Sequence, residues 1–235
     1  VGLATDEKIL KAFVLNDLKQ PGHFLLATVN GLIKQTELAN LQPGRTYRSR
    51  AMTAIKLKDQ TDRLLNVEYL KAAEPTEKLD VLACSWRGYG LRYPLADVPS
   101  SKAKAAGVKA MDLRDDHLAA VFVVKESDVI GILTQRGAFK RMRVTEIPET
   151  SRARRGVQIL RELKRNPHRI CFAALADLKK DWLITTQTAE KIDLKLNEHP
   201  LADRYSNGSF VIDTQTQGQI KFVDLIDQPS ADSAE

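Results

Sequence analysis

The chain has 235 residues, of which 43% are hydrophobic, 6% aromatic and 28% charged, a composition typical of a folded globular protein and not of a disordered one. Its longest apolar runs, 118–124 and 170–176, are far shorter than the roughly 20 residues of a membrane-spanning helix, which excludes a helical membrane protein. Lys and Arg (36) outnumber Asp and Glu (30), giving a net charge of +6, and this excess favours a polyanionic partner.

The first predicted element is the largely apolar run at 7–15, EKILKAFVL, which we predict to be a strand. The same kind of run closes each later repeat. We therefore interpret 1–20 as the last strand of an upstream repeat and expect the chain to be a piece of a longer polypeptide. The first eight residues lack a basic segment followed by an apolar one, so we expect no signal peptide and a cytoplasmic location.

Four repeats follow, at 21–75, 76–126, 127–177 and 178–227, before a tail at 228–235. Each opens with an apolar strand and a turn, at 23–31, 80–88, 129–137 and 181–190. Glycine closes the first three turns, at Gly31, Gly88 and Gly137, and Ala189 stands in the fourth. A second alternating run follows each turn, so each pair predicts a β-hairpin.

A third and a fourth strand complete each predicted repeat. The third runs are 51–57, 108–113, 157–163 and 209–214, and the fourth runs are 62–70, 116–124, 168–176 and 218–226. Val157, Leu160 and Leu163 have helical spacing, but the equivalent runs alternate, so we predict a strand there as well. Four short strands recurring about every 50 residues predict an all-β array of propeller blades or a solenoid of small sheets.

The charge is unevenly distributed along the repeats. Residues 24–70 carry +3, 80–126 carry +1, 129–176 carry +8 and 181–227 carry −4. The basic side chains recur in the second strand and in the loop before the third strand. Equivalent loops of a ring lie at equivalent heights, so we expect one basic rim that follows a phosphate backbone. The candidate residues are Lys34, Arg45, Arg48, Arg50, Arg92, Lys102, Lys104, Lys109, Arg136, Lys140, Arg141, Arg143, Arg152, Arg154 and Arg155.

Catalytic and metal-binding patterns are missing from the sequence. The chain has no phosphate loop, no GxSxG elbow and no dinucleotide fingerprint. Three aspartates, Asp112, Asp115 and Asp116, fall in a predicted turn, where Asp favours the turn geometry. We therefore expect no catalytic residue, metal or cofactor in this chain. We also expect surface histidines at His23, His117, His168 and His199, core tryptophans at Trp86 and Trp182, and reduced core thiols at Cys84 and Cys171.

The repeats FLLATVNGLIKQTEL with RSRAMTAIKL and LLNVEYL, and VIGILTQRGAFKRMRVTEI with RARRGVQIL, resemble the C-terminal domain of bacterial type IIA topoisomerase A subunits over nearly the whole chain. The resemblance implies a β-pinwheel, a propeller-like ring or spiral of four-stranded blades in which neighbouring blades exchange strands. It also implies a domain that binds and bends duplex DNA around a basic outer edge. The catalytic tyrosine of that family lies upstream, so the resemblance assigns this role to no tyrosine here.

Two members of the family are topoisomerase IV and DNA gyrase. Gyrase carries a QRRGGKG box, and the nearest match here is Arg154, Arg155 and Gly156 followed by Val157 and Gln158, so the loops resemble topoisomerase IV more closely. The resemblance implies an A2B2 holoenzyme on the bacterial chromosome, in which an ATPase B subunit and the rest of the A subunit use ATP and magnesium for strand passage. The alternatives are a gyrase wrapping domain, or a propeller that binds acidic proteins through its basic rim.

Overall fold

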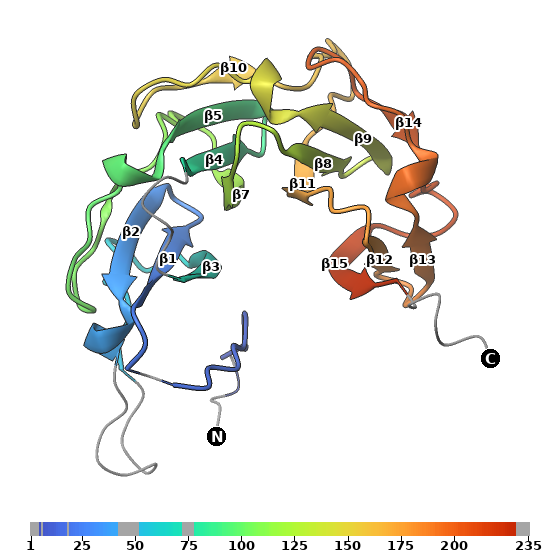
Figure 1. The fold of residues 1–235 in the computed structure, drawn as a ribbon. Coiled ribbons are helices and arrows are strands. Elements are labelled where there is room, and N and C mark those ends of the chain that lie inside the picture. Colours follow the sequence, from blue (N-terminus) through green and yellow to red (C-terminus); the bar gives the residue numbers. More distant parts are fainter. Residues whose placement is uncertain (1–4, 6, 18, 42–51, 72–77, 229–235) are drawn as a thin grey trace.

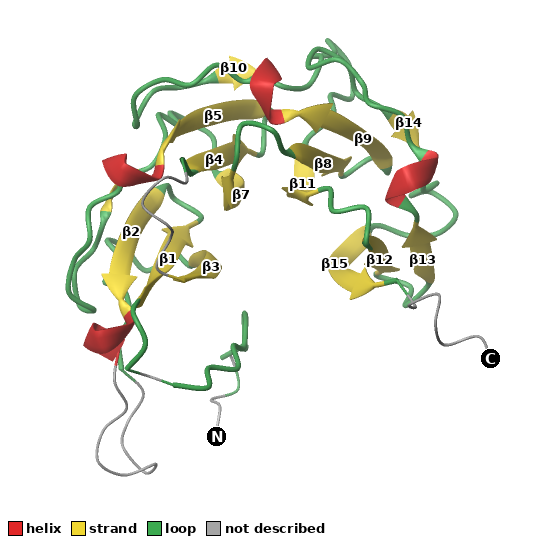
Figure 2. Cartoon of the chain, viewed as in Figure 1, coloured by secondary structure: helices red, strands yellow, loops and turns green. Residues whose placement is uncertain are grey.

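The computed structural model describes residues 5, 7–17, 19–41, 52–71 and 78–228 (Figure 1). This part of the chain is all-β, as predicted: strands and loops, with short 3-10 turns, form four sheets along an arc (Figure 2). The 3-10 turns are η1 (Leu38–Leu41), η2 (Leu95–Asp97), η3 (Val144–Glu146) and η4 (Leu196–Glu198). Among the residues described, no helix has the length and apolar character needed to span a bilayer.

Each of the first three sheets takes three strands from one repeat and its fourth strand from the next. Their strand orders are β3-β1-β2-β6 (sheet A), β7-β4-β5-β10 (sheet B) and β11-β8-β9-β14 (sheet C), and sheet D is β15-β12-β13. This confirms the implied strand exchange, and the sheets therefore do not coincide with the repeats read from the sequence. The strands are β1 (Gly22–Thr28), β2 (Leu32–Glu37), β3 (Leu64–Lys71), β4 (Asp80–Ser85), β5 (Tyr89–Pro94), β6 (Val108–Lys109), β7 (Leu118–Val124), β8 (Val129–Thr134), β9 (Ala138–Arg143), β10 (Val157–Gln158), β11 (Ile170–Leu175), β12 (Lys180–Thr186), β13 (Lys191–Leu194), β14 (Ser209–Phe210) and β15 (Ile220–Asp227).

The exchanged strands are much shorter than the sequence predicts. β6, β10 and β14 each pair over two residues with the second strand of the preceding sheet. One further backbone hydrogen bond follows, for example from the Ala110 N–H to the Gly31 carbonyl, before the chain turns onto the rim of the arc. No strand forms at 52–57 or at 7–15, contrary to our prediction, and Ala51 lies outside the described residues. The segment 7–15 instead packs through Phe13, whose ring meets Phe24 edge-on at 5.3 Å.

The hairpin turns share one backbone geometry. Gly31, Gly88 and Gly137 have φ between 80° and 89°, where a side chain is strained, and each N–H donates to the carbonyl three residues earlier. Ala189 adopts the same conformation with φ 64°. The strand pairing of the hairpin therefore holds an alanine at a positive φ that glycine adopts without strain.

The apolar core lies between successive sheets. Leu82 and Phe122 of sheet B pack with Ile130 and Met142 of sheet C, and similar clusters join sheets A and B and sheets C and D. Because β4 is covered on both faces, all of its residues are buried. The inner strands β3, β7, β11 and β15 line the concave side of the arc, whereas β6, β10 and β14 lie on its convex side (Figure 1).

Two of the four predicted core positions are confirmed and two are wrong. Cys84 and Trp182 are fully buried. Trp86 is 37% exposed because β4 ends one residue earlier, which leaves the ring in the turn. Cys171 is exposed because the register of β11 shifts between Ile170 and Phe172, which leaves this residue unpaired in a bulge. The helical spacing at 157–163 produces no helix, as expected.

Candidate nucleic-acid interface

Three loops of equal length precede the exchanged strands on the convex side. These outer loops are residues 100–107, 149–156 and 201–208. Each begins with a parallel bridge to the second strand of the preceding sheet, at Gln35, Arg92 and Arg141. Each ends in a glycine with positive φ, at Gly107, Gly156 and Gly208. The repeat therefore places equivalent loop positions at equivalent heights.

The closing glycines serve the strand exchange. A Cβ at Gly156 would collide with the Gly90 carbonyl of β5, and one at Gly208 would collide with the Phe139 carbonyl of β9. Gly107 meets the Ile33 carbonyl of β2 in the same way. Only glycine combines the positive φ with this backbone approach, so the contact partner of these glycines is the neighbouring strand.

Two lysines predicted to contact phosphate are buried beneath the outer loops. Lys34 Nζ donates to the carbonyls of Lys102 and Ala103, both at 2.8 Å, and also to those of Ala54 and Ala105. Lys140 Nζ donates to the carbonyls of Asp203, Arg204 and Ser206 at 2.7–3.2 Å. The third, fourth and sixth residues of each loop are held in both cases. Burial lowers the pKa of both lysines, that of Lys140 to about 8.

Two arginines of the second strands have a similar internal role. Arg92 donates from Nε to the Ile147 carbonyl at 2.8 Å and lies 3.3 Å from the Asp80 carboxylate, whose pKa is raised chiefly by burial. Arg141 donates to the carbonyls of Leu196 and His199 beside η4. Phosphate contact is therefore not supported for Lys34, Arg92, Lys140 and Arg141, because their donors bind acceptors inside the protein, most of them carbonyls of the next repeat. Arg143, at the end of β9, is exposed.

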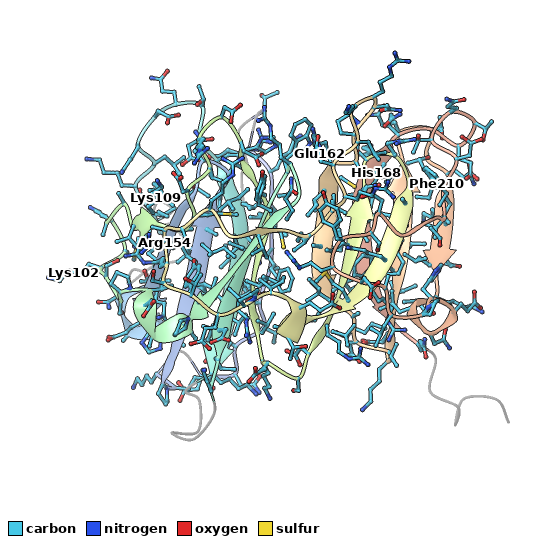
Figure 3. The ribbon with its side chains drawn as sticks, turned by 90° about the horizontal axis from the view of Figure 1, so that it is seen from above. Lys102, Lys109, Arg154, Glu162, His168 and Phe210 are labelled. Atoms are coloured by element: carbon cyan, nitrogen blue, oxygen red, sulfur yellow. The ribbon has the colours of Figure 1, made fainter. Side chains whose placement is uncertain are left out.

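On the convex side, the second outer loop packs against the residues that flank the first outer loop, so the two loops contribute to one charged surface. The Asp112 N–H donates to the Arg154 carbonyl at 2.9 Å, and Arg152 donates to the carbonyls of Asp97 and Lys109. Figure 3 shows Lys102, Lys109 and Arg154 on the same part of the molecule. We call this surface the convex basic patch. Its members are Lys102, Lys104, Lys109, Arg152, Arg154 and Arg155.

The members of the patch differ in how freely they can bind a ligand. Lys102, Lys104, Lys109 and Arg154 are exposed, whereas Arg152 is half-buried against the carbonyls it holds. Arg155 lies 4.2 Å from the centre of the Tyr89 ring, a cation–π contact that fixes its direction. Lys109 pairs with Asp112 at 2.7 Å, and this hydrogen bond is the main reason that the pKa of Asp112 is lowered.

The remaining candidates lie elsewhere. Arg136 is in the β8–β9 turn, on a rim of the arc, and Arg45, Arg48 and Arg50 lie outside the described residues. Sequence reasoning missed Arg204, which occupies the same position in its loop as Arg152. Arg204 donates to the Gln158 carbonyl of β10, and Arg152 donates to the equivalent Lys109 carbonyl of β6. The constant spacing to the loop glycine was the signal that could have identified it.

The histidines and carboxylates of the described residues form no group of three that could hold a metal ion. His168 is buried, contrary to our expectation of a surface histidine. Its two ring nitrogens lie 3.1 Å from Thr134 Oγ1 and from Arg136 Nη1. Burial is the main cause of its lowered pKa, with the Arg136 charge as the second cause. His117 stacks on Trp86 at 5.4 Å.

Comparison with known proteins relates this architecture to one family. The family model of the DNA gyrase C-terminal domain, a β-propeller, matches residues 22–71, 80–125 and 132–170, which is more than half of the chain. The A subunit of DNA topoisomerase 4 from Streptococcus pyogenes serotype M1 is 35% identical over 237 residues, and that from Bacillus subtilis (strain 168) is 36% identical over 219 residues. These matches cover 92% and 93% of this chain but only 28% and 26% of the relatives, so the chain spans about a quarter of their length.

Solved structures agree with the sequence relatives. The crystal structure of the C-terminal domain of DNA topoisomerase IV superposes with a TM-score of 0.84 at 33% identity, covering 96% of this chain and 68% of that one. The DNA gyrase A C-terminal domain superposes with a TM-score of 0.77 at 19% identity, covering 96% and 73%, and shows the shared fold alone. The exchanged sheets, the sequence relatives and the family match together show that the chain belongs to the family of gyrase-type C-terminal β-propeller domains of type IIA topoisomerase A subunits.

Proposed function

We propose that this chain is the DNA-binding domain in the A subunit of a topoisomerase IV, where it holds duplex DNA against the convex basic patch. The observation that carries the proposal is the packing of the second outer loop against the residues that flank the first, which brings exposed Lys102, Lys104, Lys109 and Arg154 onto one convex surface. The topoisomerase IV relatives, which are at least 35% identical in S. pyogenes and B. subtilis, support the assignment.

The contacts are made to phosphate groups and carry no base information. Lysine and arginine on an exposed surface bind the backbone of any sequence, so they provide affinity and position without specificity. A convex surface keeps this contact only if the duplex bends around it. Bending 20 to 30 base pairs through 40 to 90° costs about 1 to 6 kcal/mol, which several phosphate contacts must offset.

The wider role follows from the same assignment. The domain presents a bent DNA segment to a cleavage gate in the upstream part of the A subunit, within an enzyme of two A and two B subunits in the bacterial cytoplasm. The B subunits hydrolyse ATP, with magnesium, to drive strand passage for decatenation, supercoil relaxation and chromosome segregation. This chain contributes binding and bending, and the chemistry belongs to other parts of the enzyme.

Two other functions compete with this proposal. A gyrase wrapping domain would require stronger wrapping, but no complete QRRGGKG box occurs in the sequence. A scaffold for acidic proteins would use the same cations and would retain an acidic protein as well as DNA at matched ionic strength. Retention of duplex DNA without retention of the acidic protein supports the DNA-binding proposal.

The salt dependence of duplex binding tests the proposal. If about six phosphates are neutralised, the logarithm of the binding constant falls against the logarithm of salt concentration with a slope near −5. Replacing Lys102, Lys104 and Arg154 with Gln removes three contacts and should reduce the slope to about −3.

A matched control uses exposed lysines outside the patch. Replacing Lys179, Lys195 and Lys221 with Gln removes three positive charges near the ends of β12, β13 and β15 and should leave the slope within error of the wild-type value. Equal effects of the two variants would show that the slope depends on net charge and not on the position of the patch. A flat salt response of the wild type would contradict DNA binding altogether.

A further inference from the structure

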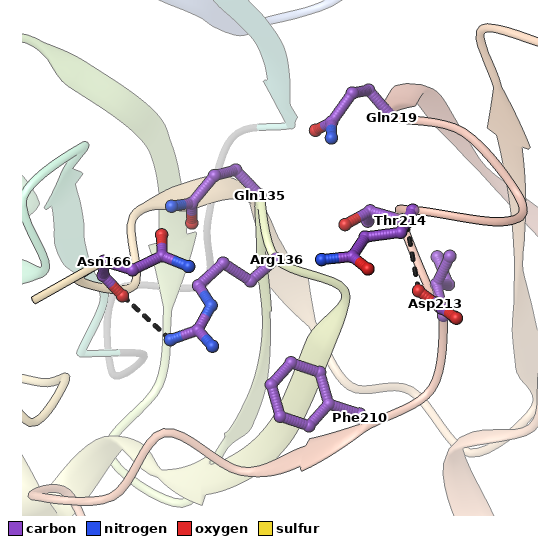
Figure 4. A pocket seen from close by; sticks show the side chains of 9 residues that line it. Gln135, Arg136, Asn166, Phe210, Asp213, Thr214 and Gln219 are labelled. Atoms are coloured by element: carbon purple, nitrogen blue, oxygen red, sulfur yellow. Dashed lines mark hydrogen bonds between the residues drawn. The ribbon is translucent and has the colours of Figure 1, made fainter.

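A groove opens on the rim of the arc where the β8–β9 turn meets the segment after β14 (Figure 4). It has a volume of about 600 Å³ and a polar lining with one aromatic ring. This rim groove is separate from the convex basic patch, with which it shares no residue. The side chains that matter below are Gln135, Arg136, Asn166, Phe210, Gln215 and Gln219.

Arg136 is held in a defined direction at one wall of the rim groove. Its Nη1 donates to the Asn166 carbonyl at 2.8 Å and lies 3.1 Å from His168 Nε2. The guanidinium lies 5.5 Å from the centre of the Phe210 ring. Among the described residues no acceptor takes a hydrogen bond from Nε or Nη2. This free edge can bind one phosphate through two donors.

Two exposed rings flank the basic part of this rim. Phe210 is 62% exposed and Trp86 is 37% exposed. His168 lies 5.8 Å from Phe210, and the next residue, Arg169, lies 5.3 Å from Trp86. The two rings are therefore connected through two consecutive residues. Large apolar rings at a polar rim lose favourable burial unless a ligand covers them.

The loop between these rings is strongly basic. Arg161, Lys164 and Arg165 are exposed, and in the described part of the chain none of them has an ion-pair partner. The acidic residue of the loop, Glu162, is bound by Arg169 at 2.9 and 3.0 Å. Figure 3 shows Glu162, His168 and Phe210 along the same side of the molecule. The rim thus carries positive charge that its own side chains leave unneutralised.

We propose that this rim binds a short segment of single-stranded DNA. A base stacks on Phe210, the amide groups of Gln215 and Gln219 face base edges, and phosphates lie against Arg136, Lys164 and Arg165. The Gln135 amide shapes the groove from within, because it binds the Pro167 carbonyl and the Arg169 N–H. Cations interleaved with exposed rings are the pattern of single-strand binding, because only an unstacked base presents its face to a side chain. Asp213 also lines the groove, where its carboxylate accepts from the Gln215 N–H at 3.0 Å. The proposal goes beyond duplex binding by the convex basic patch.

Binding of a labelled oligothymidine of about 20 nucleotides, which forms no duplex, tests the site by fluorescence anisotropy. The Phe210→Ala substitution should weaken binding by about 5- to 100-fold, the loss of one stacked base. Phe222→Ala is the matched control, because Phe222 is a 46% exposed ring on β15 outside the groove, and it should leave the affinity unchanged. No binding by the wild type, or equal affinity of Phe210→Ala, would overturn the proposal.

A second variant avoids the packing around Phe210. Lys164→Gln with Arg165→Gln removes two exposed charges and should reduce the salt slope for oligothymidine by about 1.4, from about −0.7 per contact on a single strand. Duplex binding, measured in parallel, should stay unchanged. Conversely, the Lys102, Lys104 and Arg154 variant should lose duplex affinity and keep oligothymidine affinity. If that variant lost affinity for both duplex and oligothymidine, the two ligands would share one site. This result would contradict the rim site but not the proposal that the convex basic patch binds duplex DNA.

Discussion

The ammonium group of Lys140 holds three carbonyls of an outer loop from inside the protein. Lys34 does the same for the first loop, whereas the equivalent position in sheet B is Leu91. The second loop is anchored instead by its own Arg152, which donates to the carbonyls of Asp97 and Lys109. A lysine can therefore shape the DNA-facing surface without touching DNA, because it positions the backbone that carries the exposed cations.

Replacing Lys140 with Met should lower the free energy of unfolding by about 2 to 3 kcal/mol, since a charged donor is lost and carbonyls are left unpaired. Urea denaturation at pH 7 measures this change. Arg143→Gln, at an exposed position of the same strand, should change stability by less than about 0.5 kcal/mol. The idea fails if the two substitutions have equal effects.

The stability that depends on Lys140 should also vary with pH. Burial lowers its pKa in the folded state from 10.5 to about 8, so the unfolded chain binds more protons between these values. Stability from this group then rises with pH across that window, with a slope of at most about 1.4 kcal/mol per pH unit. The difference in unfolding free energy between wild type and Lys140→Met should grow above pH 8. A constant difference would show that the pKa is not lowered.

At the scale of the element, the hairpin turn is the feature that repeats most faithfully. Four turns share the same hydrogen bond, and three of them use glycine at the residue with positive φ. The fourth uses Ala189, and alanine is strained in this conformation. The turn geometry is therefore imposed by strand pairing and not by the turn residue alone.

Ala189→Gly should stabilise the protein by about 1 kcal/mol, because it removes the strain of a Cβ at positive φ. The reciprocal change, Gly137→Ala, should destabilise it by more than this, since the new Cβ would also collide with the Ile212 carbonyl. Thermal unfolding of both variants measures the effects. Destabilisation by Ala189→Gly would mean that the alanine methyl group contributes packing that outweighs its strain.

At the scale of the molecule, the arc converts a linear pattern of charge into a curved surface. The third repeat carries +8 and the fourth −4, and the outer loop 149–156 of the third repeat leans back onto the segment that leads from the second repeat into sheet A. Strand exchange thus moves the positive charge one sheet backwards along the arc. The convex basic patch lies over sheets A and B for this reason.

A convex track of cations should bend DNA and alter its linking number. Ligation of nicked circular DNA in the presence of the chain should shift the distribution of topoisomers relative to ligation without protein, whereas binding without curvature leaves it unchanged. Lys102→Glu with Lys104→Glu and Arg154→Glu should abolish the shift, and Lys179→Glu with Lys221→Glu should preserve it. An unshifted distribution at saturating wild-type protein would contradict bending.

The local elements could be predicted from the sequence because their causes are local. Alternation identified the hairpins, the turn glycines identified their ends, and the inner strands began within two residues of the predicted positions. The pattern could not determine the length of the exchanged strands, since 108–113 is predicted as one strand but pairs with β2 only at Val108 and Lys109. After Lys109 the chain leaves β2 and contacts the outer loop of the next repeat, and this change of direction depends on residues that are distant in the sequence.

The sequence by itself determined the repeat, the all-β class and the excess of positive charge in the third repeat, because each is a property of neighbouring residues. Only the tertiary structure decided which cations face solvent. Lys34 and Lys102 have the same side chain and both belong to a basic recurrence, yet one is buried and donates to the carbonyl of the other. Three of the four carbonyls that bind Lys34 come from the next repeat, and a contact between distant segments leaves no mark in the local pattern of either.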